Sequence, residues 1–245
     1  MFNRLKKYPI IVHVVRSVRL LLGQTPEKLS QHFHISRQGQ LIQDYMSSSS
    51  PKKLQIGAQG NSINGWLNAD IEPKANHVVY MDATKTFPFG DNTLDYVFAE
   101  HMIEHIPYGD ADFMIKECFR VLKPQGKIRI ATPNLMGAIQ VLQNPDTPEH
   151  KEYIDHYYNL FIDQGVPRDP AFVVNKLFYG FKHRFIHTEF TLTHLLETNG
   201  FNHVRKYEVG ESNDPELTGV EQHMNEMGLV PNKVETIVMQ AQKNG

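Results

Sequence analysis

The chain has 245 residues, of which 40% are hydrophobic and 21% charged, and its formal net charge is -2. This length suits one core domain with extensions, and the small net charge gives no global attraction to nucleic acid, so no nucleic-acid partner is expected. One cysteine, Cys118, excludes an internal disulfide framework and is typical of a reducing cytosol. We therefore expect a cytoplasmic globular protein with Cys118 packed in a helix.

Residues 1–50 are predicted to form a basic amphipathic helix followed by a linker. Apolar residues between Ile10 and Leu22 fall on one side of a helix, opposite two arginines that interrupt the run too much for a membrane span. The preferred interpretation is that this helix docks onto its own domain or self-associates. A peripheral hold on the inner face of an anionic membrane is the alternative. The polar residues 24–50, ending in SSSSP, are predicted to be the linker.

Residues 51–245 are predicted to form one α/β domain with a mostly parallel sheet. Short apolar runs, read as strands, are KLQIGA, WLNADI, HVVYMDA, LDYVFAEH and GKIRIAT, and they suit burial on both faces of such a sheet. A helix is expected between the last two of these strands. Asp110 would cap its start, and Lys123, Pro124 and Gly126 would end it. Strand, helix, strand is the parallel crossover unit.

Residues 135–187 are predicted to be a helical insertion into this domain. Tyr153, Tyr157 and Phe161 recur at helical spacing, and we interpret them as the core of the insertion rather than a platform for a sugar. A helix with an apolar leucine stripe follows, and then two strands, HVRKYEV and ETIVMQAQ, close the chain.

Three blocks carry a family resemblance: LQIGAQGNSINGWLNADI, VVYMDATKTFPFGDNTLDYVFAEHMIEHIP and ECFRVLKPQGKIRIATPN. Together they resemble the class I S-adenosylmethionine-dependent methyltransferases over residues 52–134. The likeness is strongest to a small group whose first motif reads Leu-Asn-Ile-Gly-Cys-Gly and continues as Gly-Trp-Ile-Asn-Val-Asp. The resemblance implies a Rossmann-like sandwich with an antiparallel last strand and S-adenosyl-L-methionine as cofactor.

Two acids and a glycine at strand ends are the main candidates for contacts to this cofactor. Gly57 ends the first strand, where a missing Cβ lets backbone approach a ligand, and Asp70 could accept two hydroxyl hydrogen bonds from a ribose. The resemblance implies that Asp82 accepts from the adenine amino group and that the Ala83 N–H faces the ring. The full candidate set is Gly57, Gln59, Gly60, Asp70, Ile71, Asp82, Ala83, Glu100 and His101.

The segment AEHMIEHIPYG follows the fourth strand, where the resemblance places the methyl group of the cofactor. His101, Glu104 and His105 are spaced i, i+3, i+4 and share one face if the segment turns helically. Methyl transfer depends chiefly on alignment and desolvation, but a hydroxyl nucleophile gains from a base. His101 is the first candidate for that base, with Glu104 or His105 behind it. The alternative for all three is a role in orienting the loop.

The segment YGFKHRFIH leads out of the insertion and is expected to line the acceptor pocket. Tyr179, His183 and Arg184 are candidates to contact a sugar or phosphate group, and a structural ion pair or solvated edge is the alternative for Arg184. The thirteen histidines show no convincing ligand spacing, because His101 and His105 form HxxxH without the glutamate of HExxH. We therefore expect no metal site.

The first motif departs from the family pattern in two ways. Gln55 replaces the acid and Gln59 the second glycine, so only Gly57 keeps its place, with Gly60 one position late. About twelve residues separate Gly57 from Asp70, which leaves no room for a full crossover helix. The early crossovers are thus expected to be short, with one thin face of the sheet covered by the N-terminal helix.

The sequence favours a methyltransferase that acts on a hydroxyl of a small-molecule or glycosidic acceptor. The alternative is a cofactor-binding or vestigial methyltransferase-like domain that serves as a partner or membrane-surface scaffold, because the glycine turn is altered. A nicotinamide-dependent oxidoreductase is disfavoured by the missing GxGxxG turn.

Overall fold

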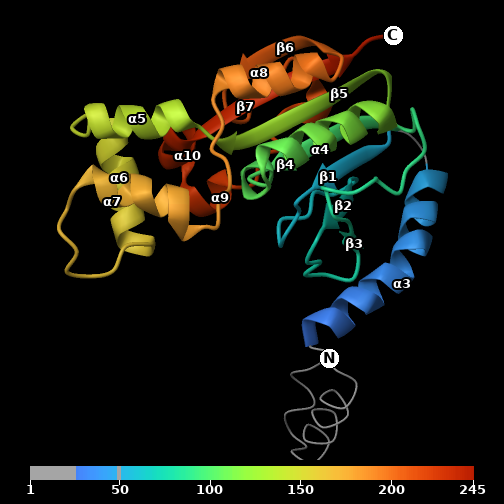
Figure 1. The fold of residues 1–245 in the computed structure, drawn as a ribbon, viewed down its shortest axis with the longest axis horizontal. Helices are drawn as coiled ribbons and strands as arrows, with labels where there is room; N and C mark the ends of the chain where they lie inside the picture. Colours follow the sequence, from blue (N-terminus) through green and yellow to red (C-terminus); the bar gives the residue numbers. More distant parts are fainter. Residues whose placement is uncertain (1–25, 49–50) are drawn as a thin grey trace, which may run out of the picture.

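A seven-stranded sheet forms the centre of the computed structural model, which describes residues 26–48 and 51–245 (Figure 1). The strand order is β3-β2-β1-β4-β5-β7-β6, and β7 runs antiparallel to both β5 and β6 while β1 to β5 pair in parallel. This confirms the expected Rossmann-like sheet. The strands are β1 (Lys53–Ile56), β2 (Leu67–Asp70), β3 (Val79–Tyr80), β4 (Leu94–Glu100), β5 (Leu122–Pro133), β6 (Phe201–Tyr207) and β7 (Thr236–Lys243).

The connections from β1 to β2 and from β2 to β3 contain no helix, as their length predicted. The prediction of a linker at 24–50 is wrong, because α3 (Pro26–Ser47) is a helix whose end packs on the main core through Leu41, Ile42, Tyr45 and Met46. A polar helix forms here because a few apolar side chains on one face suffice to dock it onto the thin part of the sheet. The amphipathic helix predicted before it lies outside the described residues.

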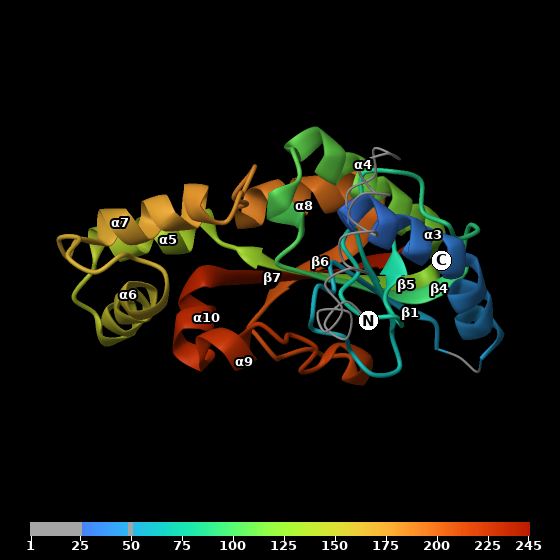
Figure 2. The same ribbon diagram turned by 90° about the horizontal axis from the view of Figure 1, so that it is seen from below.

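The two faces of the sheet are covered differently (Figure 2). On one face lie α4 (Tyr108–Val121) and α8 (Glu189–Thr198), which share a core with the strands, and Cys118 is buried in α4 as expected. The other face is covered by the connection after β6, which includes η3 (Pro215–Leu217) and buries Trp66 and Phe98.

The boundaries of α4 differ from the prediction. Asp110 lies in the first turn, and the residue before the helix is Pro107, with no side-chain cap. The helix ends at Val121 and β5 begins at once, so Lys123 and the following proline and glycine belong to the strand. The pairing of β5 with β7 begins at Lys127, and the pairing with β4 shifts register between Leu122 and Lys127, so the turn-forming residues 123–126 make an irregularity within the strand.

A helical layer stands beside the carboxyl ends of the strands (Figure 1). Tyr153 and Tyr157 are buried in its core and Phe161 packs against them, as predicted for an insertion core. None of the described helices is long and apolar enough to cross a membrane. The elements of this layer are α5 (Leu135–Gln143), α6 (Pro148–Leu160), α7 (Pro170–Asn175) and η2 (Lys176–Gly180) from the insertion, with α9 (Met224–Met227) and α10 (Leu229–Glu235) from the connection before β7.

Candidate active site

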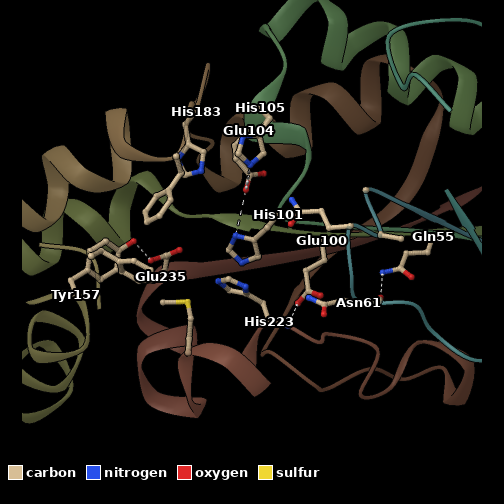
Figure 3. Close-up of a pocket in the computed structure, with 16 residues that line it drawn as sticks. Gln55, Asn61, Glu100, His101, Glu104, His105, Tyr157, His183, His223 and Glu235 are labelled. Atoms are coloured by element: carbon tan, nitrogen blue, oxygen red, sulfur yellow. Dashed lines mark hydrogen bonds and ion pairs between the residues drawn. The ribbon is translucent and has the colours of Figure 1, made fainter. Parts of the chain in front are cut away.

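A cavity of about 360 Å³ opens between the carboxyl ends of β1 and β4 and the helical layer. Its walls come from the loop after β1, the segment after β4 that contains η1 (Ile103–His105), the insertion and the connection before β7 (Figure 3). Of the residues predicted from sequence, it brings together Gly57, Gln59, Glu100, His101, Glu104, His105 and His183. Lining residues that the sequence prediction missed are Gln55, Ala58, Asn61, Tyr157, Phe161, Phe181, His223, Met227 and Glu235.

The loop after β1 is shaped by its own side chains and by the segment after β4. Gly57 has φ of +80°, and a Cβ there would lie 2.6 Å from Cβ of Met102, so the glycine is required by this close approach. The Gln55 side chain donates to the Asn61 carbonyl at 3.0 Å and accepts from the Ile63 N–H at 3.3 Å. The glutamine that replaces the family's acid therefore closes the loop.

The two predicted adenosine contacts lie at the ends of β2 and β3, outside the cavity lining. Asp70 is buried, and its Oδ2 accepts from the Gln59 N–H while its Oδ1 accepts from the Glu72 N–H, both at 2.7 Å. Asp82 Oδ1 accepts from the N–H and hydroxyl of Thr84. Each acid thus orders the loop beside it.

Three further predicted contacts also lie outside the cavity lining. Ile71 is exposed and Ala83 is buried. A Cβ built on Gly60 would meet no atom within 4 Å, so no described side chain fills the space beside this part of the loop. The neighbouring Gln59 has φ of +43°, a conformation that costs energy for a residue with a side chain.

His101 is turned into the cavity by an unusual backbone conformation. Its φ is +45°, which is rare outside glycine, and its N–H donates to the Ala131 carbonyl at 2.9 Å. Its ring Nδ1 lies 3.4 Å from Oε1 of Glu104, and Nε2 lies 3.3 Å from the hydroxyl of Thr236. Both ring nitrogens of His101 therefore face oxygen atoms.

Glu104 is completely buried on η1. Its Oε2 accepts from the Thr132 hydroxyl at 2.8 Å, and its Oε1 lies 3.9 Å from Nε2 of His105. Burial alone would raise the pKa of this carboxyl, but the neighbouring His101, with a smaller effect of His105, lowers it to about 2. The pKa of His101 is raised, because the Glu104 carboxylate outweighs the opposing effect of burial. The two groups are therefore electrostatically coupled.

The far wall of the cavity comes from the connection before β7. Glu235 Oε2 accepts from the hydroxyls of Tyr153 at 2.7 Å and Tyr157 at 2.6 Å. The ring of His223 lies 4.0 Å from the ring of His101, centroid to centroid. Burial, and to a smaller extent the neighbouring His101, lower the pKa of His223 to about 3. A sequence signal for this wall was weak, because its residues lie in a polar connection far from the recognised motifs.

Glu100 positions this wall. Its carboxylate, buried at the end of β4, accepts from the N–H groups of Gln222 at 2.8 Å and His223 at 3.0 Å. Burial raises the pKa of Glu100, and these two hydrogen bonds oppose that effect. A residue expected to contact the cofactor thus also fastens the C-terminal connection to the sheet.

Only one of the three predicted acceptor contacts lines the cavity. His183 does so, whereas the Tyr179 side chain is 78% exposed and lies outside the lining. Arg184 is also outside it, but its backbone N–H donates to the Glu104 carbonyl at 2.7 Å. The end of the insertion is therefore tied to η1, which brings His183 next to His105 with ring centroids 4.8 Å apart.

Comparison with known proteins gives a family match within the core. Residues 61–130 match the model of a methyltransferase domain family. No protein of curated function matches the sequence significantly.

Solved structures that resemble this chain include several described as methyltransferases. One from Archaeoglobus fulgidus, described as S-adenosylmethionine-dependent, has 17% identity and a TM-score of 0.45 over 87% of this chain and 95% of that one. One from Methanosarcina mazei has 19% identity and a TM-score of 0.41 over 83% and 97%. Phosphoethanolamine N-methyltransferase 2 of Haemonchus contortus has 15% identity and a TM-score of 0.41 over 86% of this chain and 53% of that one. The chain thus spans about half the length of that last enzyme, and likenesses at this level do not bear on activity.

The residues at the strand ends fit S-adenosylmethionine as cofactor. The cavity reaches the loop after β1, the space beside Gly60 is open, and each Asp70 oxygen accepts only one of the two hydrogen bonds it can take among the described residues. When bound, this cofactor supplies an electrophilic methyl group on a sulfonium centre. A methyltransferase domain model thus matches residues 61–130, and the strand order with β7 antiparallel is the Rossmann-like methyltransferase fold that the sequence predicted.

Proposed function

We propose that the chain methylates a hydroxyl group of a small-molecule or glycosidic acceptor and uses S-adenosylmethionine as methyl donor. The observation that carries the proposal is one cavity that joins the loop after β1 to His101 and to the aromatic wall of the insertion (Figure 3). Donor and acceptor would share this space, and holding two reactants in line is the main contribution an enzyme makes to such a displacement.

The lining of the acceptor side suits a ring that carries hydroxyl groups. Tyr157, Phe161, Phe181 and Met227 supply aromatic and apolar surface on one side. Across the cavity, imidazole and carboxylate groups provide the few polar contacts that fix orientation in such pockets. A sugar has both kinds of surface, since its C–H face packs on aromatic rings and its hydroxyls form hydrogen bonds.

His101 is proposed as the base that takes the hydroxyl proton. The Glu104 carboxylate, 3.4 Å from Nδ1, would stabilise the imidazolium that results, and this carboxylate is held in place by the Thr132 hydroxyl. The closed surroundings of Glu104 keep water away from the pair, which strengthens its electrostatic effect.

Calorimetry with S-adenosylhomocysteine, the demethylated cofactor, tests the cofactor site. The wild-type protein should bind it in the micromolar range, and Asp70→Asn and Asp82→Asn should each weaken binding about tenfold, because each removes a charged acceptor. The exposed His194→Ala serves as a matched control that should bind as the wild type does. Unchanged binding in both aspartate variants would show that the cofactor lies elsewhere.

Release of S-adenosylhomocysteine with a panel of sugars and small alcohols tests the reaction. His101→Gln should lower turnover about 100-fold, as expected for loss of a general base, and leave cofactor binding within about twofold. Equal turnover in this variant would remove His101 from the role of base. Cofactor binding without turnover on any acceptor would support the scaffold alternative instead.

A further inference from the structure

Glu104, His105 and His183 form a cluster on one side of the cavity. The proposed reaction gives a role to Glu104 but none to the two histidines. One ligand atom from each lies within 4.8 Å of the others. Glu104 and His105 belong to η1, and His183 follows η2 at the end of the insertion (Figure 3). The backbone N–H groups of Arg184 and Phe185 donate to the Glu104 carbonyl at 2.7 and 3.2 Å, so the cluster is held together by the main chain.

Two atoms of this cluster lack hydrogen-bond partners. Glu104 is fully buried, yet its Oε1 has no partner among the described residues, since the nearest ring nitrogens, of His101 and His105, stand at 3.4 and 3.9 Å. Nδ1 of His183 is also buried and, within the described part of the chain, without a partner. Leaving a buried carboxylate oxygen unpaired is costly, and unmatched groups of this kind are the places where an ion or water is expected.

We propose that Glu104, His105 and His183 bind a divalent transition-metal cation of the Zn²⁺ type. Two imidazoles and one carboxylate are the donor set of open zinc sites, in which a fourth position is left for water or substrate. The Thr132 hydroxyl donates to Oε2 at 2.8 Å and would orient the carboxylate, as the groups behind metal ligands commonly do.

The separations within the cluster require small movements on binding. With metal–ligand bonds of about 2.0 to 2.1 Å, ligands of a tetrahedral site lie about 3.3 Å apart. The three atoms here lie within 4.8 Å, and the His105 to Glu104 separation is 3.9 Å, so rotation of the two imidazoles closes the site. His105 and His183 are partly buried, and their rings pack with centroids 4.8 Å apart, so this rotation would rearrange that contact.

A second cluster, His101, His223 and Glu235, has similar spacing but is already engaged. Glu235 Oε2 accepts from two tyrosine hydroxyls, and Nε2 of His101 lies 3.3 Å from the Thr236 hydroxyl. The geometry therefore favours the cluster whose atoms lack partners.

A role for the ion in catalysis rests on the proposed methyl transfer, whereas binding of the ion by these three residues does not. Glu104 Oε1 also lies 3.4 Å from Nδ1 of His101, so an acceptor oxygen in the open position of the metal would lie next to the proposed base. A bound dication lowers the pKa of a coordinated hydroxyl, so the ion would activate an acceptor hydroxyl that takes the fourth position.

Zinc binding by the full chain tests the proposal. After treatment with a chelator, the protein is dialysed against Zn²⁺ and analysed for metal, and Co²⁺ replaces Zn²⁺ to give visible absorption that reports nitrogen and oxygen ligands. Wild type and the control His194→Ala should retain one ion per chain. His183→Gln and Glu104→Gln should bind at least about tenfold more weakly, and His223→Gln should bind as the wild type does.

Circular dichroism and thermal unfolding check that each variant is folded. If Glu104→Gln does not fold, the comparison rests on His183→Gln, because His183 is only partly buried. The proposal is overturned if the wild type retains no ion, if His183→Gln binds as tightly as the wild type, or if His223→Gln loses the ion. Because metal content is read without turnover, failure here leaves the methyl-transfer proposal standing and is distinct from its failure.

Discussion

Polar side chains at the strand ends use much of their hydrogen-bonding capacity on neighbouring loops. Asp70 holds the backbone of Gln59, Gln55 closes the loop after β1, and Glu100 fastens the segment at Gln222. Buried backbone N–H groups need such acceptors where no strand or helix supplies them. At the residue scale, the side chains at the strand ends therefore hold in place the loops that form the site, and their remaining hydrogen-bonding capacity is available to a ligand.

His187 provides a prediction about pH. It is fully buried, with its ring 4.8 Å from that of Phe185, and burial lowers its pKa to about 4. The unfolded chain takes up a proton near pH 6.5 and the folded chain only near pH 4, so the free energy of unfolding falls as the pH drops between these values.

We expect the wild type to lose about 2 kcal/mol more than His187→Gln between pH 7 and pH 5, measured by urea unfolding. The exposed His194→Gln should follow the wild type over the same range. Parallel pH profiles for His187→Gln and the wild type would contradict the assignment.

At the scale of elements, α3 replaces the crossover helices that the short connections cannot hold. The Tyr45 hydroxyl accepts from the Lys53 N–H at 2.8 Å and lies 3.1 Å from the Gly65 carbonyl. One residue of α3 thus joins the start of β1 to the end of the loop before β2. The contribution of α3 to the stability of β1 and β2 can be measured by removing this hydroxyl.

Tyr45→Phe should lower the free energy of unfolding by about 1 to 2 kcal/mol, because it leaves the Lys53 N–H without its acceptor. Urea denaturation gives the value. Gln40→Ala, which removes an exposed hydrogen bond to Asp44 on the same helix, should change it by less than about 0.5 kcal/mol. An equally small effect of Tyr45→Phe would mean that α3 is not docked as described.

At the scale of the whole molecule, the connection between β6 and β7 joins the sheet to the cavity. Arg129 on β5 and Glu221 in this connection are both fully buried and form an ion pair at 2.5 Å. The other two guanidinium nitrogens have no partner among the described residues. The Gly210 N–H also donates to Glu221 Oε2 at 3.1 Å, and the guanidinium lies 5.7 Å from the centroid of the Tyr207 ring. For such a buried pair, removal of one charge is expected to be worse than removal of both.

Glu221→Gln should destabilise the protein by about 3 to 5 kcal/mol because it leaves a buried guanidinium unpaired. The double variant Arg129→Met with Glu221→Leu should recover part of this loss. Thermal and urea unfolding of the single and double variants measure the difference. A double variant less stable than Glu221→Gln would show that the pair contributes net stability.

Much of the core could be predicted because its information is local. The apolar runs and short connections predicted the parallel sheet and the lack of early crossover helices, and the spacing of His101, Glu104 and His105 predicted one shared face. Pattern reasoning failed for α3, where burial of a few side chains outweighs a polar composition. The expectation of no metal site rested on spacing along the chain, which cannot include a residue such as His183 that arrives from another element.

The strands of the parallel core and the segment after β4 could be predicted, since both depend on short-range periodicity and on motifs within residues 52–134. The surroundings of that segment depend on tertiary packing instead. His183 reaches it because main-chain hydrogen bonds tie the insertion to η1, and Glu235 reaches it because two tyrosines hold its carboxylate. Contacts between residues 78 or more positions apart arise from packing, which no local pattern encodes.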